Sequence, residues 1–530
     1  MRDNSNKLSL LLFKCVTFLS LTVTIDCAEN NIIAGPTLVF RGTEIISETM
    51  DNAWVVSAMV VTKKNDKMPP DLTYLNQNNS PETIEFLNVI KDSPFEFLRY
   101  TMRIKMTTAE QKISYKIGAE TGEFYVPGSH DTPHILYTSC NDMDKEGTDR
   151  NWGSVLMQHN EKPIHLGLGG GDQIYCDGIL DIPDIKSLLA QNDNNTTFVR
   201  TLFSEDLAKE VLNFYINNYI RYLQHPAYKK ILSSVPHLNM NDDHEIFDGW
   251  GSYPVMLQNC EVMTGIFQIA QQVYLGFQHH MQESEAQEKY GYLIGTTRFQ
   301  KNNRHFNRQS FSFLREVNSC AILGLDHRGE RTREKILSQG VYDEIYTALG
   351  NISSQCKHLL LMVGVPIVFP DVSATHSFFD AADPYSDHNT LFKKISHSFV
   401  TAITGKDAFG LSEPTDDIVY DHWECKEHIA ERDNFIRKIM QFANNRFLEK
   451  KPIRISLLSG DIHLAAAGAI SPERPIDRIA QNPFFIMQLI SSGIGSKWES
   501  AFLLKLLELT AAKKQYIEKN DNTGPILRYV

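Results

Sequence analysis

The sequence predicts an α/β fold, and two observations support this prediction. From His134 onward, apolar runs of strand length alternate with long segments of helical periodicity. Each apolar run also ends in polar or glycine-rich residues, as the strands of an α/β sheet do. The clearest helical segments are residues 206–224, 262–281 and 430–450, and the last leads straight into a strand pattern that starts at Arg454.

The first part of the chain has a different pattern. Residues 31–125 consist of short alternating stretches separated by Asn, Pro and Asp clusters, which is typical of a small antiparallel β domain. We expect residues 126–530 to form the main α/β domain, with helical insertions near 180–235 and 255–315. A chain of 530 residues is long enough for a large core and for more than one domain.

The N-terminal residues allow two interpretations. Arg2 and Lys7 precede an apolar stretch, which indicates a signal or anchor segment over residues 1–30. Lys14 interrupts that stretch, however, and apolar and polar residues alternate over 19–26, which is typical of a β-strand. The protein would be secreted or periplasmic in the first case and cytoplasmic in the second. No other run is apolar for long enough to span a bilayer.

Composition limits the classes of partner. The 52 basic and 64 acidic residues give a net charge of −12, so we expect no broad basic surface for nucleic acid or anionic lipid. An anionic substrate must then be held by a local positive feature, such as a metal or a few arginines. The eight cysteines contain no C-x-x-C pair, which argues against a zinc ribbon and, in a chain of this size, against a disulfide scaffold.

Reactive residues gather where the predicted strands end. Cys140, Asp172, Asp326 and Asp461 each follow an apolar run. In open α/β sheets, ligands bind at the carboxyl ends of the strands. These four positions therefore indicate one edge of the sheet as the place of a functional site.

The segment HLGLGGGDQIYCDG, residues 165–178, has four glycines within five residues. It lacks the lysine of a Walker loop and the spacing of the dinucleotide fingerprint, so direct cradling of phosphate is disfavoured. Asp172, followed three residues later by Tyr175, indicates a metal site instead, because a phenolate is a hard ligand suited to ferric iron. The alternative is an aspartate that caps a turn beside a half-buried tyrosine.

Two further segments concentrate side chains of ligand type. The segment NMNDDHEIFDGWGSYP, residues 239–254, combines carboxylates with an imidazole, and its apolar residues favour a packed segment over a solvated acidic turn. The segment SGDIH places Asp461 and His463 two residues apart after a strand, so both side chains can face one metal. A lone histidine would more often be a core residue.

Together these motifs resemble, in the same order, those of PhoD-like phosphatases within the calcineurin-like metallophosphatase superfamily. The matching segments are YTSCND around Cys140, GDQIY at 171–175, DDHEIFDGWGSYP at 242–254, LDHRGERT at 325–332, DIVYDHWECKEHIAER at 417–432 and LSGDIHLAAAG at 458–468. The resemblance implies a four-layer αββα metallophosphatase sandwich after the small N-terminal β domain. It also implies hydrolysis of small phosphate monoesters or diesters by a metal-activated water at a two-metal centre.

The resemblance implies a role for individual residues as well. Arg328 would contact phosphate and His244 would act as the catalytic residue beside the substrate. The cofactors would be ferric iron and a second divalent metal. A harder ion, calcium first and manganese or magnesium as alternatives, is favoured there over zinc, because the V-x-x-H histidine of the superfamily has no clear counterpart and the site is richer in oxygen. The metal ligands would be Cys140, Asp172 (as the bridge), Tyr175, Asp243, Asp461 and His463.

The sequence also allows alternatives to this function and to some of the residue roles. The missing V-x-x-H histidine also fits a pseudo-phosphatase that binds a phosphorylated partner or acts as an interaction protein. Residues 421–423 would be either pocket or structural residues, and Glu330 and Arg331 would form a structural ion pair or cap. His279 and His280 would be a surface pair on an amphipathic helix.

Overall fold

The computed structural model describes residues 32–46, 52–64, 69–75, 85–87, 93–191, 195–301, 304–370, 409, 420–472, 482–496, 515–516 and 525–529. The segment predicted as a signal, an anchor or a strand, residues 1–30, lies outside these described residues. No helix in the described part of the chain is long and apolar enough to cross a membrane.

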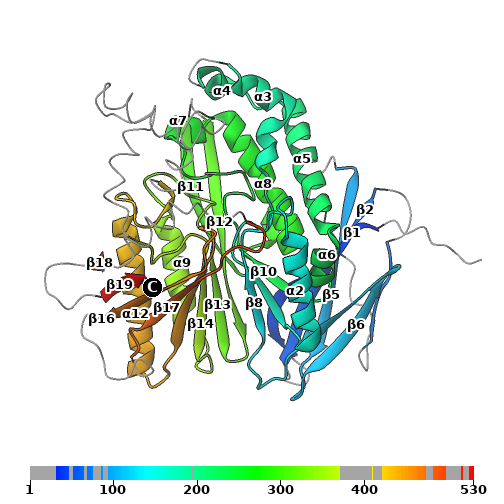
Figure 1. Ribbon diagram of the computed structural model, residues 1–530, viewed down its shortest axis with the longest axis vertical. Coiled ribbons are helices and arrows are strands. Elements are labelled where there is room, and N and C mark those ends of the chain that lie inside the picture. Colours follow the sequence, from blue (N-terminus) through cyan, green and yellow to red (C-terminus); the bar gives the residue numbers. More distant parts are fainter. Residues whose placement is uncertain are drawn as a thin grey trace, which may run out of the picture.

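Two large β-sheets lie at the centre of a mixed α/β fold (Figure 1). The seven-stranded sheet has the order β4 (Glu85–Leu87), β5 (Phe95–Lys105), β2 (Asn52–Lys63), β1 (Ile32–Ile45), β10 (His237–Asn239), β9 (Leu166–Gly169) and β8 (Ile135–Thr138). The nine-stranded sheet has the order β11 (Tyr292–Lys301), β12 (Arg304–Val317), β13 (Cys320–Leu325), β14 (His358–Val363), β15 (Arg454–Ser459), β17 (Ile486–Ile490), β16 (Ala466–Pro472), β19 (Pro525–Tyr529) and β18 (Gln515–Tyr516). A third sheet of three strands has the order β3 (Leu72–Leu75), β6 (Gln111–Ile117) and β7 (Glu120–Val126).

Helices lie beside both large sheets. The three long helices lie close to their predicted bounds: α5 (Glu205–Leu223), α8 (Glu261–His279) and α12 (Ile429–Leu448). Ser204 begins α5 as a side-chain cap that accepts a hydrogen bond from the Leu207 amide at 3.2 Å. The other α-helices of the described residues are α2 (Thr148–Glu161), α3 (Pro183–Leu189), α4 (Thr196–Arg200), α6 (Pro226–Leu232), α7 (Val255–Gln258) and α9 (Gln339–Gly350), with short 3₁₀ turns at Asp177–Asp181 and Glu283–Glu285.

Parallel strands form one end of the seven-stranded sheet and the middle of the nine-stranded sheet. In the first sheet β8, β9 and β10 pair in parallel, and in the second β13, β14, β15 and β17 do so. Parallel strands place their carboxyl ends at the same edge. The loops that follow β8, β9, β10, β13 and β15 therefore meet, which is where the sequence places its candidate ligands.

The N-terminal strands join the main sheet rather than forming a sheet apart. The antiparallel pairs predicted within 31–125 are present, but β1 also pairs in parallel with β10 at Val39 and His237. Only β3, β6 and β7 form a separate sheet, so the boundary predicted near residue 125 does not separate two sheets. The physical reason is visible in β2, which is buried on both faces and therefore belongs inside a sheet.

The segment predicted as a helical insertion near 255–315 is helical only as far as His279. Residues 292–317 instead form the hairpin of β11 and β12, and the reason is the alternation of serine and phenylalanine over residues 310–313, which is a strand period.

The surface pair predicted at His279 and His280 is also wrong, because both imidazoles are fully buried.

Their partners explain the burial of these two histidines. The His279 ring bonds the hydroxyls of Tyr292 and Tyr274 at 2.6 and 2.7 Å. His280 bonds Thr37 and Ser57 at 2.9 and 3.0 Å. Buried imidazoles are tolerated when both ring nitrogens are satisfied.

Three clusters of buried apolar side chains connect these layers. One lies between the two large sheets and joins β9 and β10 to β13, β14 and β15. A second joins the outer face of the first sheet to α5, α6 and α8, and a third joins the second sheet to α9 and α12. In Figure 1, α9 and α12 accordingly lie on the side of the second sheet, and α2, α5 and α6 lie on the side of the first.

A buried ion pair links β5 to the turn after α8 and predicts an acid-sensitive contribution to stability. Arg99 donates two hydrogen bonds of 2.9 Å to the Glu285 carboxylate. Burial raises the pKa of Glu285, but Arg99, the Gln282 amide and Lys289 outweigh it and lower that pKa to about 2. Because the folded-state pKa is depressed, this stabilisation is present above the unfolded-state pKa and is lost as the pH falls toward 2.

We therefore expect Glu285→Gln to lower the free energy of unfolding by about 2 kcal/mol at pH 7. The difference from the natural protein should shrink between pH 5 and pH 2.5, as measured by urea unfolding followed by circular dichroism. Glu288→Gln, at an exposed position in the same segment, is the matched control and should show no such pH-dependent loss. A Glu285→Gln deficit that stays constant over this pH range would contradict the assignment.

Candidate metal centre

The candidate ligands lie on backbone of unusual conformation at the carboxyl edge of the two sheets. Cys140, Asp172, Asp461 and His463 have φ values of 53°, 56°, 67° and 56°, in the left-handed region that non-glycine residues rarely adopt. Such conformations cost energy and persist where the surrounding structure imposes them, most often at functional sites. Four of the six predicted metal ligands share this feature.

Gly171 allows the loop after β9 to reach its neighbour. Its φ is 109°, and a Cβ atom at this position would lie 2.6 Å from the Cβ of Asp242. Only glycine fits such an approach. The glycine run therefore brings the loop that carries Asp172 against the loop after β10 that carries Asp242 and Asp243.

Two groups of side chains with metal-ligand spacing lie in this region. Ligand atoms of Asp172, Asp243 and His244 lie within 4.8 Å of one another, and so do those of Asp242, Asp243 and Asp461. The residue common to both groups is Asp243, whereas the sequence assigned the bridge to Asp172. Asp242 was not among the predicted ligands, although it stands beside Asp243 in the same motif.

The remaining predicted ligands adjoin these groups. The Tyr175 hydroxyl lies 3.3 Å from Nε2 of His463, and the Tyr175 ring lies 4.0 Å from that of His244. Cys140 is a fully buried free thiol whose amide donates to the Gly171 carbonyl at 3.2 Å. The loops after β8, β9 and β15 thus bring a thiol, a phenol and an imidazole beside the carboxylates.

The donor set fits bound cations. Asp172 Oδ1 and Asp242 Oδ2 are buried and have no hydrogen-bond partner in the described residues. Burial raises the pKa of Asp172 well above its ordinary value, and the charge of Asp242 raises it further. Although burial raises the pKa of Asp242, Arg328 at its other oxygen lowers that pKa to about 2, so the carboxylate of this pair that is costly without a positive charge is Asp172. The unpartnered oxygens therefore favour metal ions as the missing partners.

Glu245 holds the two ligand loops together, a role that the sequence motif did not reveal. Its carboxylate is fully buried. Oε2 accepts from the amides of Asp172 and Asp242 at 3.0 and 2.9 Å, and Oε1 accepts from the Gln173 amide at 2.7 Å. One side chain therefore fixes the backbone of both loops next to the candidate ligands.

Arg328, predicted to contact phosphate, is fully buried among the acids. Its guanidinium donates to Asp242, to both oxygens of Asp421 at 2.5 and 2.7 Å, to Asp243 at 3.4 Å and to the Trp250 carbonyl at 3.0 Å. All of its N–H groups are thus engaged with the chain. A phosphate contact stays a prediction that requires some of these bonds to be exchanged.

Asp421 is the main anchor of that arginine. Although burial raises the pKa of Asp421, Arg328 and Arg331 together hold it well below its ordinary value. The Asp421 carboxylate also accepts from the Ser252 hydroxyl at 2.9 Å. Asp326 follows β13 as predicted, but its carboxylate accepts from the Phe311 amide on β12 at 2.7 Å and from the amides of Arg328 and Gly329 in its own loop at 3.1 and 3.0 Å.

His244 is oriented by a carboxylate that the sequence analysis missed. Its Nδ1 donates to Asp177 at 2.8 Å, and the same oxygen of Asp177 accepts from the Asp248 amide at 2.8 Å. Burial lowers the pKa of His244, but Asp177, Asp243 and Asp172 outweigh it and raise that pKa well above its ordinary value. Nε2 of the imidazole lies 3.9 Å from the Asp248 carboxylate, beyond hydrogen-bond distance, so this nitrogen can bind another partner.

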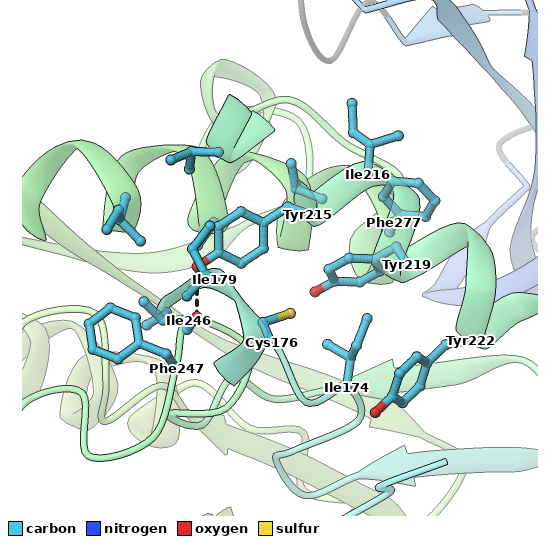
Figure 2. Close-up of a cluster of buried hydrophobic side chains, with 14 of the residues drawn as sticks. Ile174, Cys176, Ile179, Tyr215, Ile216, Tyr219, Tyr222, Ile246, Phe247 and Phe277 are labelled. Atoms are coloured by element: carbon cyan, nitrogen blue, oxygen red, sulfur yellow. Dashed lines mark hydrogen bonds between the residues drawn. The ribbon is translucent and has the colours of Figure 1, made fainter. Parts of the chain in front are cut away.

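Helix α5 packs against the segments that carry Tyr175 and His244. Figure 2 shows its tyrosines packed against Ile174, Cys176 and Ile246, which flank the candidate ligands in the sequence. The Tyr215 hydroxyl donates to the Ile246 carbonyl at 2.6 Å (Figure 2). Asn218, also on α5, donates to the Tyr175 carbonyl at 2.8 Å. A packed helix thus sets the positions of the segments that carry Tyr175 and His244.

Comparison with known proteins gives three findings. Residues 104–406 and 406–525 match the model of a family described as PhoD related phosphatase. The chain is 27% identical over 500 residues to the uncharacterized protein YGR266W of Saccharomyces cerevisiae, with 84% of this chain and 68% of that protein covered. A solved structure described as the structure of PhoD aligns with a TM-score of 0.48 and 13% identity, over 88% of this chain and 78% of that one.

Proposed function

The chain belongs to the family of PhoD-related phosphatases, and on that premise we propose that it is a metal-dependent hydrolase of small phosphate monoesters or diesters. The observation that carries the proposal is the pair of buried, unpartnered carboxylate oxygens, Asp172 Oδ1 and Asp242 Oδ2, at the edge where the strand ends meet. The helix layers outside both sheets also support the four-layer sandwich expected for such an enzyme.

In this proposal two metal ions are held by the predicted ligands together with Asp242. Ferric iron would lie by Tyr175 and His463, because a phenolate suits a ferric ion. A second divalent ion, calcium in preference to manganese or magnesium, would lie by the oxygen-rich group of Asp243 and Asp461. When bound, such a metal pair supplies an activated water near neutral pH and neutralises charge on the phosphoryl oxygens.

The protein's own side chains would divide the remaining work. Asp177 holds the His244 imidazole by Nδ1, so Nε2 can give a proton to the leaving oxygen of the ester. Glu245 fixes the loops, and Arg328, anchored by Asp421, supplies positive charge next to the acids. No serine nucleophile of the G-x-S-x-G type is needed, which agrees with its absence from the sequence.

The test is hydrolysis of an aryl phosphate monoester and diester by the full chain, with and without chelator, beside elemental analysis. The proposal predicts turnover that chelator removes and that added iron and calcium restore. Turnover of the same size in the chelated protein would refute it. A substrate panel of nucleotides, lipid phosphates and phosphoproteins would then identify the class of ester.

A second candidate is a pseudo-phosphatase that binds a phosphorylated partner. The buried Arg328 favours it, because its guanidinium already forms ion pairs with Asp242, Asp243 and Asp421 and so offsets part of their negative charge without a metal. Elemental analysis separates the two candidates. About one iron per chain together with turnover would exclude the pseudo-phosphatase, whereas a metal-free chain that binds phosphopeptide without turnover would support it.

Tyr175→Phe tests the proposed ferric ligand directly. A ferric phenolate absorbs visible light, so the iron-loaded protein should be coloured and the variant should lose that band. The measurement is visible absorption at matched iron content. Tyr346→Phe, on α9 away from the site, is the control and should keep the colour. A band of unchanged intensity in Tyr175→Phe would exclude this tyrosine as the ligand.

A further inference from the structure

A large cleft lies at the opposite edge of the second sheet from the candidate metal centre. It has a volume of about 1110 Å³ and is lined by residues of β1, β5 and β12, by Ser319 just before β13, and by the turn before β14. The candidate centre lies beyond the other end of β13, about 20 Å away at the rise of an extended strand. The cleft is therefore a separate site, of the size that small molecules occupy.

Cations dominate the charged lining of this cleft, in a chain whose net charge is −12. The cations are Arg41, Arg103, Lys289 and Arg315, and we call the cleft that they line the arginine cleft. Some of the lining charges are already paired: Glu44 with Arg103 inside the lining at 3.1 Å, and Lys289 with Glu285 outside it at 3.0 Å. The other lining acid, Glu316, accepts from the Ser353 amide at 3.0 Å and from the Cys356 thiol at 3.3 Å.

Two of these cations lack a counter-charge. Neither Arg41 nor Arg315 has a carboxylate partner among the residues that the structure describes. Arg41 donates to Ser57 at 3.0 Å and to the His280 carbonyl at 2.9 Å, while Arg315 donates to the carbonyls of Leu314 and Tyr290 at 2.8 and 2.7 Å. Each guanidinium is thus held in place by neutral groups.

Burial makes this arrangement costly without an anion. Arg315 is only 9% exposed, and its Nε–H is buried and has no acceptor. Burial lowers the pKa of both guanidinium groups. The two positive charges also repel each other, and the charge of Arg315 lowers the pKa of Arg41 further. Tyr290 is shared between the two, because Arg41 lies 4.2 Å over its ring and Arg315 binds its carbonyl. An anion in the cleft would compensate both charges at once.

We propose that the arginine cleft binds a small soluble molecule that carries clustered phosphate groups. Guanidinium groups match phosphate oxygens, and a phosphate ester carries a charge of about −2. The two arginines without a carboxylate partner would bind the first phosphate, and Arg103 and Lys289, which are exposed and paired at the surface with Glu44 and Glu285, can turn toward a second. The volume exceeds what a single phosphate would fill, which leaves room for an organic body. This site is independent of the proposed hydrolysis.

The probe for the test is methylenediphosphonate, which resists hydrolysis, titrated into the full chain by calorimetry. We expect binding that weakens at least about 30-fold in Arg315→Gln, the loss typical of removing a buried charged partner. Arg103→Glu, at the exposed rim, should weaken it about 5-fold without disturbing the core. Lys209→Gln, an exposed change on α5, and Asp172→Asn, in the metal centre, should leave this binding intact.

Other outcomes overturn the proposal. Binding that Asp172→Asn removes and Arg315→Gln and Arg103→Glu leave unchanged would place the probe at the metal centre. Binding of vesicles containing phosphatidylinositol bisphosphate, with no binding of the soluble diphosphonate, would assign the cations to a membrane surface. Hydrogen exchange supplies a readout independent of variant folding: the probe should protect the segments 41–46 and 314–319 in the natural chain, and protection elsewhere alone would refute the cleft.

Discussion

Replacing Asp172 with asparagine is expected to lower phosphoesterase activity about 1,000-fold, equivalent to about 4 kcal/mol of transition-state stabilisation. Asparagine keeps the size of the side chain and its place on the left-handed backbone, a conformation that asparagine tolerates well. It removes the negative charge that a buried metal ligand supplies. The measurements are turnover of an aryl phosphate and metal content per chain, and both should fall together.

The metal-free state of this variant separates a lost ligand from a lost fold. Asp172 Oδ1 is buried and has no hydrogen-bond partner in the described residues, and burial together with the charge of Asp242 raises the pKa of Asp172, so its charged form is costly until a cation is present. After chelation, Asp172→Asn should therefore unfold at the same urea concentration as the natural chain or at a higher one. Asp206→Asn is the control, since that side chain is 94% exposed and its ion pair in the described part of the chain is with Lys209 along α5. Natural levels of activity in Asp172→Asn would remove the aspartate from the metal centre.

The positions of the candidate ligands could be predicted because they depend on local pattern. An apolar run that ends in glycine or aspartate marks a strand end, and parallel strands bring their ends to one edge. Asp172, Asp243 and Asp461 meet there for that reason. The sequence around these aspartates does not reveal that Asp243 belongs to both groups of candidate ligands, because that depends on the distances between loops from different sheets.

The predictions that the structure contradicts concern features that depend on contacts between distant parts of the chain. The N-terminal strands have antiparallel pattern, but their place beside β10 is set by a pairing of residues 39 and 237. The pattern of its own helix predicts a surface position for His279, whereas its burial depends on a hydrogen bond with the hydroxyl of Tyr292 in the hairpin that follows. Asp177 reads as an ordinary turn aspartate until the fold places it 2.8 Å from His244. Periodicity reports which face of an element is apolar and not which element covers it.

Glu245→Ala is expected to lower the free energy of unfolding by at least about 3 kcal/mol. The change leaves the amides of Asp172, Gln173 and Asp242 buried without an acceptor, and each such group costs about 1 to 3 kcal/mol. The measurement is urea unfolding of the chelated protein, which removes any contribution from metal binding. Activity should fall as well, since both ligand loops lose the group that fixes them.

The comparison with Glu245→Gln makes this assignment specific. Glutamine keeps one oxygen acceptor but turns an NH₂ group toward amides that can only donate, so we expect a loss smaller than that of alanine and still larger than about 1 kcal/mol. Glu161→Ala, at the exposed end of α2, is the matched control and should stay within about 0.5 kcal/mol of the natural chain. Stability of Glu245→Ala within that same range would mean that the two loops are held by their packing on α5, and the carboxylate would then have no structural role.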